Sequence, residues 1–139
     1  MAIRLVIEGN PIAKKRPRFA RRGKFTMTYN DQETEEGRFL WEVKNQFHEK
    51  PLECPLELDV IFYMKMPKTS GVKTRKMVEG NILPTKKPDL DNLVKFTKDC
   101  LNGVVWKDDA LVCCTTMKKV YSDNPRTEII IKELEAEAA

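Results

Sequence analysis

The residues Leu56–Met66 read LELDVIFYMKM and alternate in hydrophobicity along their whole length. Every second position, beginning at Leu56, is Leu, Val, Phe or Met, while the positions between them include Glu57 and Asp59. Because successive side chains of a strand point to opposite faces of a sheet, this pattern predicts a strand with one face in the core. The other elements are placed around this strand.

Two main helices and three further strands are predicted on either side of it. The expected elements are a strand over Ala2–Glu8, a helix capped by Asp31 with Leu40, Val43 and Phe47 inward, a short helix over Thr74–Val78, a helix over Asp89–Leu101 with Leu90, Leu93, Thr97, Cys100 and Leu101 inward, and strands over Ala110–Tyr121 and Thr127–Leu134. The turn signal at residues 122–125 predicts a hairpin of the last two strands. The segment from residue 9 to about Thr28 shows no sustained period and is expected to be a loop. The predicted fold class is α+β, one domain over residues 1–139 in β-α-β-α-β-β order, with a mixed sheet packed by two main helices.

The composition describes an ordinary globular domain. The 139 residues are 41% hydrophobic and 33% charged, with a net charge of +4. No apolar run approaches the roughly 20 residues that span a bilayer, and no signal-peptide pattern opens the chain, so we expect a cytoplasmic protein that does not enter a membrane. The cysteines form no Cys-x-x-Cys pair and are interpreted as small core side chains: Cys54, Cys100, Cys113 and Cys114. A single histidine, His48, excludes mechanisms that need two.

Two pairs of aspartates flank the predicted helix over Asp89–Leu101. Asp89 and Asp91 come at its start, and Asp108 and Asp109 follow the turn after its end. Each has an ordinary structural interpretation, because Asp is a preferred N-cap and a common turn residue. Together the pairs offer the hard oxygen ligands that Mg²⁺ prefers, from two elements that the chain can bring side by side. Such a site suits metal-assisted phosphodiester hydrolysis.

Lys95 stands four residues from both Asp91 and Asp99, so the three side chains share one face of the predicted helix. One interpretation is a set of surface salt bridges contributing about 0.3–0.5 kcal/mol each. The other is catalytic, in which Lys95 compensates charge on the phosphoryl oxygens or positions the attacking water. Asp99 and Asp108 are expected to support the metal ligands from the next layer of side chains.

A basic stretch follows the first strand, and two lysines precede the acidic helix. Aromatic residues are interleaved with the cations of this stretch, a pattern typical of phosphate contacts and base stacking. A nuclear localisation signal or a ribosomal-type tail has a similar composition. The expected DNA contacts are Lys14, Lys15, Arg16, Arg18, Arg21 and Arg22, with Lys86 and Lys87 holding the scissile phosphate.

Other nuclease patterns fit poorly. The sequence has no GxxxxGK phosphate loop, and its one Glu-x-Lys triplet, Glu42-Val43-Lys44, precedes Pro88-Asp89, the reverse of the common PD…(D/E)xK order. A single histidine also excludes the His-Asn-His type.

The segment Lys87–Val112, KPDLDNLVKFTKDCLNGVVWKDDALV, resembles the core of the RusA crossover junction endodeoxyribonucleases. Members of this family resolve Holliday junctions by paired symmetric nicks in four-way DNA, act as homodimers with Mg²⁺ or Mn²⁺, and are often carried by phages and prophages. The resemblance implies that Asp89, Asp91 and Asp109 bind the metal and that Lys95 is the essential lysine. It selects Asp109 over Asp108.

Two other functions stay open on the residues alone. The first is a non-catalytic DNA-binding module whose aspartates are caps and turn residues. The second is a less selective flap or single-strand nuclease of the same chemistry. For a dimer interface, the candidates are the helix around Phe39 and Trp41 and the terminal hairpin, although Trp41 also suits a core position.

Overall fold

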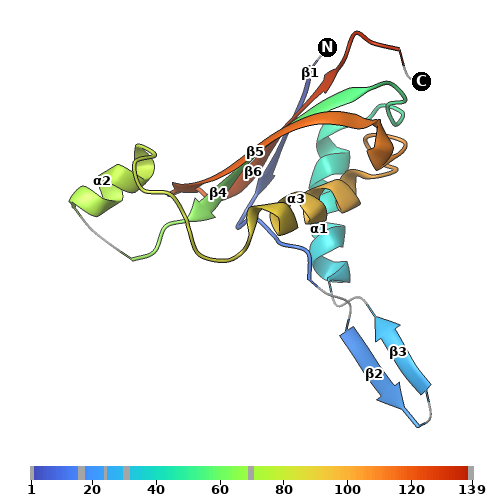
Figure 1. Cartoon of the computed structure of the whole chain (residues 1–139), viewed down its shortest axis with the longest axis horizontal. Helices are drawn as coiled ribbons and strands as arrows, with labels where there is room; N and C mark the ends of the chain where they lie inside the picture. The colour runs from blue at the N-terminus through green and yellow to red at the C-terminus, as the bar shows by residue number, and fades with distance from the viewer. Residues whose placement is uncertain (1, 16–17, 24, 30–31, 69–70, 138–139) are drawn as a thin grey trace.

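A four-stranded mixed sheet, with strand order β1-β6-β4-β5, forms the centre of the molecule (Figure 1). The computed structural model describes residues 2–15, 18–23, 25–29, 32–68 and 71–137. The strands of this sheet are β1 (Ala2–Glu8), β4 (Leu56–Lys65), β5 (Val112–Ser122) and β6 (Arg126–Glu133). β6 pairs antiparallel with both β1 and β4, whereas β4 and β5 run parallel. The strand predicted from LELDVIFYMKM therefore lies inside the sheet, and its alternation buries Leu56, Leu58, Val60 and Phe62 against the core.

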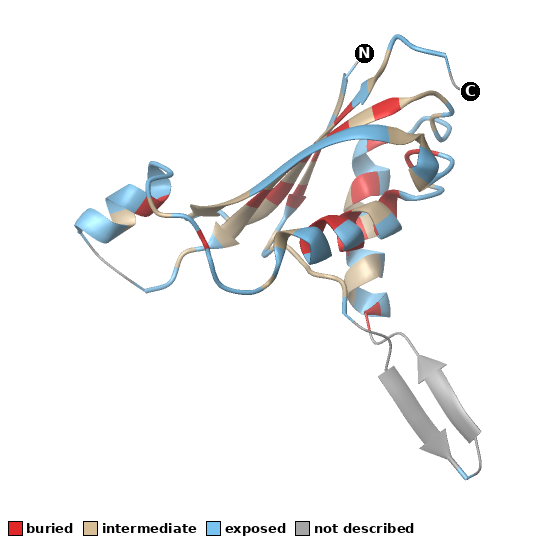
Figure 2. Cartoon of the chain, viewed as in Figure 1, coloured by how far each residue is buried: buried red, intermediate tan, exposed pale blue. Residues whose placement is uncertain are grey.

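Helices α1 (Glu33–Gln46) and α3 (Leu90–Leu101) pack together with the core side of this sheet. Their rings meet edge to face, with the centroids of Phe39 and Phe96 5.6 Å apart. Figure 2 shows the buried residues on the strands of the sheet and on the sides of both helices that face the core. A short helix, α2 (Val72–Val78), and a 3₁₀ turn, η1 (Asp109–Leu111), lie in the connections. The α+β class, the mixed sheet and both main helices are confirmed.

The predicted hairpin of the last two strands is wrong. β6 pairs with β1 and β4, and β5 pairs with β4, so β4 separates the two strands that the sequence joins by a turn. The side chains of β5 are mostly exposed, and it occupies the edge of the sheet, whereas β6 buries Ile129 and Ile131. A polar strand tolerates an edge position, and an apolar one is better placed inside, which accounts for this order.

The basic segment predicted as a loop contains two strands. β2 (Arg18–Arg22) and β3 (Phe25–Tyr29) pair antiparallel as a separate two-stranded sheet. Gly23, between them, has a φ of +60°, a left-handed conformation that glycine adopts without steric cost. The glycine turn signal is present in the sequence, but β2 (RFARR) carries too many charges to show an apolar period. β3 (FTMTY) does alternate, with Phe25, Met27 and Tyr29 at every second position, and this five-residue signal was missed.

Three smaller expectations also change. Cys113 and Cys114 are exposed on β5, so only Cys100 and the half-buried Cys54 fit the interpretation of core cysteines. Trp41 is 67% exposed, which contradicts a core position. The N-cap of α1 is Gln32, and Asp31, expected there, lies outside the described residues. In the described chain, no helix has the length and apolar character needed to span a membrane.

Candidate active site

The start of α3 presents two aspartates to solvent. Asp89 occupies the N-cap position with extended backbone angles, but its side chain accepts no capping hydrogen bond. Asp91 lies in the first helical turn, and both carboxylates are exposed. Among the residues that the structure describes, neither carboxylate has a hydrogen-bond or ion-pair partner. The interpretation of Asp89 as a side-chain cap is therefore wrong, and both groups are available to a ligand.

One surface pocket brings three of the predicted site residues together. Asp91 and Lys95 reach it from α3, and Asp109 reaches it from η1. The pocket has a volume of about 250 Å³, and Val94, Lys98 and Asp99 complete its lining. Asp89 is not part of this lining. Three carboxylates and two ammonium groups from α3 and η1 thus line one small volume, and of the three predicted metal ligands it includes Asp91 and Asp109 but not Asp89.

The carboxylate of Asp109 is held in place by its neighbours. The indole N–H of Trp106 donates to Oδ1 of Asp109 at 2.8 Å, and the backbone N–H of Asp109 donates to Oδ1 of Asn102 at 2.9 Å. Trp106 is fully buried, and its carbonyl accepts from the backbone N–H of Gly103 at 2.7 Å. Hydrogen bonds within the turn between α3 and η1 therefore orient Oδ1 of Asp109, and the other carboxylate oxygen is left for a ligand.

Lys95 is not neutralised along its own helix. Asp99 forms an ion pair with Lys14 instead, with Oδ2 and Nζ 3.2 Å apart. Within the described part of the chain, no carboxylate lies within ion-pair distance of Lys95. The alternative of salt bridges between Lys95 and its neighbours four residues away is therefore wrong, and the ammonium group is free to meet an anion.

The segment leading to Asp89 is tethered to the sheet. Lys119 on β5 donates from Nζ to the carbonyl oxygens of Lys86 at 2.9 Å and Pro88 at 2.8 Å. Lys119 pairs in register with Phe62, which points into the core, so its side chain lies on the face of the sheet that α3 covers. This tether fixes the position from which α3 begins.

The root of the basic segment lies against α3 and α1. The backbone N–H of Lys14 donates to the carbonyl of Asn92 at 3.0 Å. Gln32 is fully buried, and its side-chain amide accepts from the N–H of Lys15 at 2.7 Å and donates to the carbonyl of Ala13 at 2.8 Å. These contacts place Lys14 and Lys15 beside the acidic helix. Four predicted DNA contacts of the basic segment have side chains outside the described residues: Arg16, Arg18, Arg21 and Arg22. The other two predicted contacts, Lys86 and Lys87, are exposed just before α3.

Asp108 and Cys100 have structural surroundings. Asp108 accepts a hydrogen bond from the N–H of Ala110 at 3.1 Å and so caps η1, and it lines a different pocket from Asp109. Burial of the Cys100 thiol, strengthened by the nearby carboxylates Glu36 and Asp99, raises its pKa to about 12. The Cys100 thiol is therefore protonated near neutral pH and cannot act as a thiolate ligand.

The carboxylates of the pocket suit a hard cation. In the described residues, no three His, Cys, Asp or Glu side chains are gathered closely enough to hold a metal ion by themselves. Mg²⁺ keeps several waters and is commonly bound through one or two carboxylates together with the phosphates of its substrate. Asp91 and Asp109 supply two carboxylates in one pocket. The donor set therefore fits Mg²⁺ or Mn²⁺ in a site that a phosphate completes.

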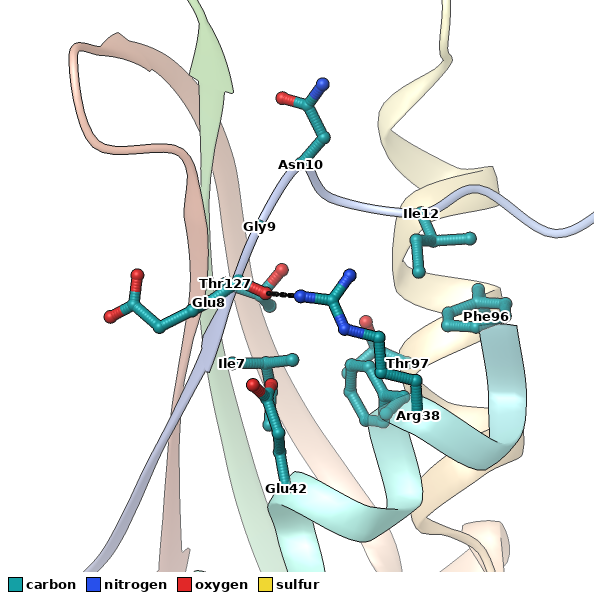
Figure 3. A pocket seen from close by; sticks show the side chains of 11 residues that line it. Ile7, Glu8, Gly9, Asn10, Ile12, Arg38, Glu42, Phe96, Thr97 and Thr127 are labelled. Atoms are coloured by element: carbon teal, nitrogen blue, oxygen red, sulfur yellow. Dashed lines mark hydrogen bonds between the residues drawn. The ribbon is translucent and has the colours of Figure 1, made fainter. Parts of the chain in front are cut away.

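A second, smaller cavity lies between β1, α1 and α3 (Figure 3). Arg38 closes it by donating to the carbonyl of Glu8 at 3.5 Å, and Glu42 points one buried carboxylate oxygen toward it. Its volume of about 20 Å³ is close to that of a single water molecule. We assign it no part in the chemistry.

Sequence reasoning found the acidic residues but missed the groups that orient them. Asn102, Trp106, Lys119 and Gln32 hold these residues through contacts that their places in the sequence do not indicate. A fully buried Gln and an indole N–H beside a carboxylate do not appear in the hydrophobic period of the sequence, because each acts through a single hydrogen bond in the folded chain.

Two comparisons with known proteins match most of the chain. The family model Endodeoxyribonuclease RusA matches residues 8–132, a range that includes every residue of the pocket. The uncharacterized protein YqaN of Bacillus subtilis strain 168 is 37% identical over 139 residues, covering 96% of this chain and 98% of the relative.

Proposed function

The chain belongs to the RusA family of endodeoxyribonucleases, and on that premise we propose that it resolves Holliday junctions by paired, metal-dependent nicks in four-way DNA. The observation that supports this most directly is the pocket shared by Asp91, Lys95 and Asp109. In a binding module, these aspartates would serve as caps and turn residues. Here Asp89 forms no side-chain cap, and Asp109 is oriented by a buried indole.

The residues of the pocket divide the work of phosphodiester hydrolysis. When bound, Mg²⁺ or Mn²⁺ supplies Lewis-acid polarisation of the scissile phosphate and lowers the pKa of an attacking water. Asp91 and Asp109 would hold the cation in the pocket. Asp89, at the helix start and outside the pocket lining, is proposed as a further carboxylate for it. Lys95 donates to a phosphoryl oxygen as negative charge builds there. Lys86 and Lys87 hold the strand beside the cut.

Resolution of a junction requires two matched nicks, and a homodimer with two-fold symmetry supplies two such sites. The arms of the junction would contact the basic segment, whose root at Lys14 and Lys15 lies against the acidic helix. The exposed Trp41 on α1 is an apolar side chain available for subunit contact.

The test compares cleavage and binding of synthetic four-way, flap and linear duplex DNA in the presence of Mg²⁺. Asp91→Asn should abolish nicking because it removes a cation ligand, while junction binding stays intact or becomes tighter as repulsion of phosphate falls. Asp123→Asn, in an exposed turn, is the matched control and should cut like the parent. Light scattering of the same preparation reports the dimer.

The outcomes separate the alternatives. Full cutting by a pure Asp91→Asn preparation contradicts the assigned site. Binding without any nicking by the parent indicates a non-catalytic DNA-binding module. Equal cutting of flaps and junctions indicates a less selective branched-DNA nuclease.

A further inference from the structure

A further pocket, distinct from the acidic pocket and from the small cavity of Figure 3, is lined by lysines. Four lysines line it, and we call it the lysine pocket: Lys65, Lys68, Lys86 and Lys87. Tyr121 and four apolar residues complete the lining: Met64, Met66, Pro67 and Pro84. Its volume is about 430 Å³, and no Asp or Glu contributes to its lining. All four lysines are exposed, and in the described part of the chain none has a carboxylate within ion-pair distance. Four uncompensated ammonium groups around one hollow favour a polyanion.

Its position follows from the sheet. Lys65 ends β4, and Tyr121 stands near the end of β5 in register with Met64. Tyr121 is two residues from Lys119, so both side chains lie on the same face of β5. Because Lys119 binds the carbonyls of Lys86 and Pro88, the lysine-bearing segment is fixed beside Tyr121.

The lysine pocket is close to the acidic residues. Lys87 and Asp89 are two residues apart, a span of at most about 7 Å between their Cα atoms. A strand whose phosphate lies among the four lysines therefore continues toward Asp89 within a few nucleotides. Tyr121 is half-buried and is the aromatic residue of the pocket lining, and stacking of a base on an aromatic ring is a sequence-tolerant contact.

We propose that the lysine pocket binds the backbone of the DNA strand next to the cut, with Lys65 and Lys68 as phosphate contacts and Tyr121 as a stacking platform. The proposal rests on the nuclease function above and extends the DNA contacts beyond Lys86 and Lys87. A strand matches the lining better than a single phosphate, since four separate cations serve several phosphates in a row.

The test measures junction affinity as a function of salt, in EDTA so that no cleavage occurs. Neutralising two phosphate contacts by Lys65→Gln with Lys68→Gln should make the slope of log K against log salt shallower by roughly 1.4–1.8, at about 0.7–0.9 for each contact. The matched control is Lys44→Gln with Lys50→Gln, which removes the same charge at exposed positions outside the pocket, and its slope should equal that of the parent. Tyr121→Ala should weaken binding about fivefold or more at every salt concentration, and Tyr121→Phe should not.

An unchanged slope in the first double variant, or an equal change in both double variants, overturns the proposal. The parent's cleavage of junctions in Mg²⁺ is assayed separately. If the parent nicks junctions and the slope does not change, only the lysine pocket is wrong. If the parent binds without nicking, the nuclease function fails, and the slopes still decide whether the pocket holds DNA.

Discussion

Trp106→Phe isolates the group that orients Asp109. The substitution removes the indole N–H that donates to Oδ1 of Asp109 at 2.8 Å. A hydrogen bond to a charged acceptor contributes about 1.5–3 kcal/mol, and the lower end applies because water reaches the half-exposed Asp109. The smaller ring also leaves a cavity at a fully buried site, adding roughly 1 kcal/mol. The expected loss of unfolding free energy is therefore about 2–3 kcal/mol, or roughly 7–10 °C in Tm.

The functional effect is expected in cation binding, and this part rests on the proposed metal site. A carboxylate that loses the partner fixing its orientation typically binds a metal about 10- to 100-fold more weakly. Mn²⁺ affinity, measured by electron paramagnetic resonance without DNA, reports this directly. The Mg²⁺ dependence of nicking, measured well below the Tm, should shift by the same factor and be rescued at high Mg²⁺.

Trp41→Phe makes the same chemical change at a side chain that is 67% exposed and outside the acidic pocket, so it should leave Mn²⁺ binding unchanged. The positioning role of Trp106 is refuted if Trp106→Phe, folded at the assay temperature, binds Mn²⁺ and responds to Mg²⁺ as the parent does.

Two more predictions concern the sheet. Lys119→Met keeps the aliphatic stem but loses both hydrogen bonds to the segment before Asp89, so the free energy of unfolding should fall by roughly 1–2 kcal/mol. The rate of single-turnover nicking should fall by a larger factor than the affinity for junctions. The control Lys118→Met, at an exposed neighbouring position, should change neither stability nor nicking. For Glu128, partial burial alone would raise the pKa, but the hydrogen bond and charge of Arg126, the hydrogen bond from Tyr63 and the charge of Arg4 together outweigh it and hold this pKa below its ordinary value of 4.5. The contribution of Glu128 to the free energy of unfolding is therefore present above pH 4.5 and is lost as pH falls through the lowered pKa. In urea unfolding, the stability difference between the parent and Glu128→Gln should shrink in acid. A stability difference that is constant with pH contradicts this prediction.

Most of the fold could be predicted because periodicity reports burial. The alternation of β4 and the apolar stripe of α3 both place a core face, and the structure buries those faces. The neighbours of each strand could not be predicted, because a turn between β5 and β6 specifies proximity in the chain but not pairing. Which strands pair depends on burial across the whole sheet, a property of no single segment.

The sequence predicted that Asp91, Lys95 and Asp109 would lie together, but not that Asp89 would stand outside their pocket or which groups support them. The spacing of Asp91 and Lys95 places them on one helix face, and the chain returns Asp109 to the same pocket. The lysine pocket is different, since Lys65, Lys86 and Tyr121 are far apart in sequence and only the ends of β4 and β5 bring them together.

The division between supporting and reacting groups explains how the fold carries unpaired charge. Asp91 and Lys95 are exposed, so water solvates them and leaving them unpaired costs little folding free energy. Trp106 is fully buried, and its indole would lose a hydrogen bond if Asp109 turned away. Packing thus fixes the direction of the Asp109 carboxylate while the exposed charges stay free for ligands. In the proposed nuclease, a cation and a phosphate would complete the site without a change in the core.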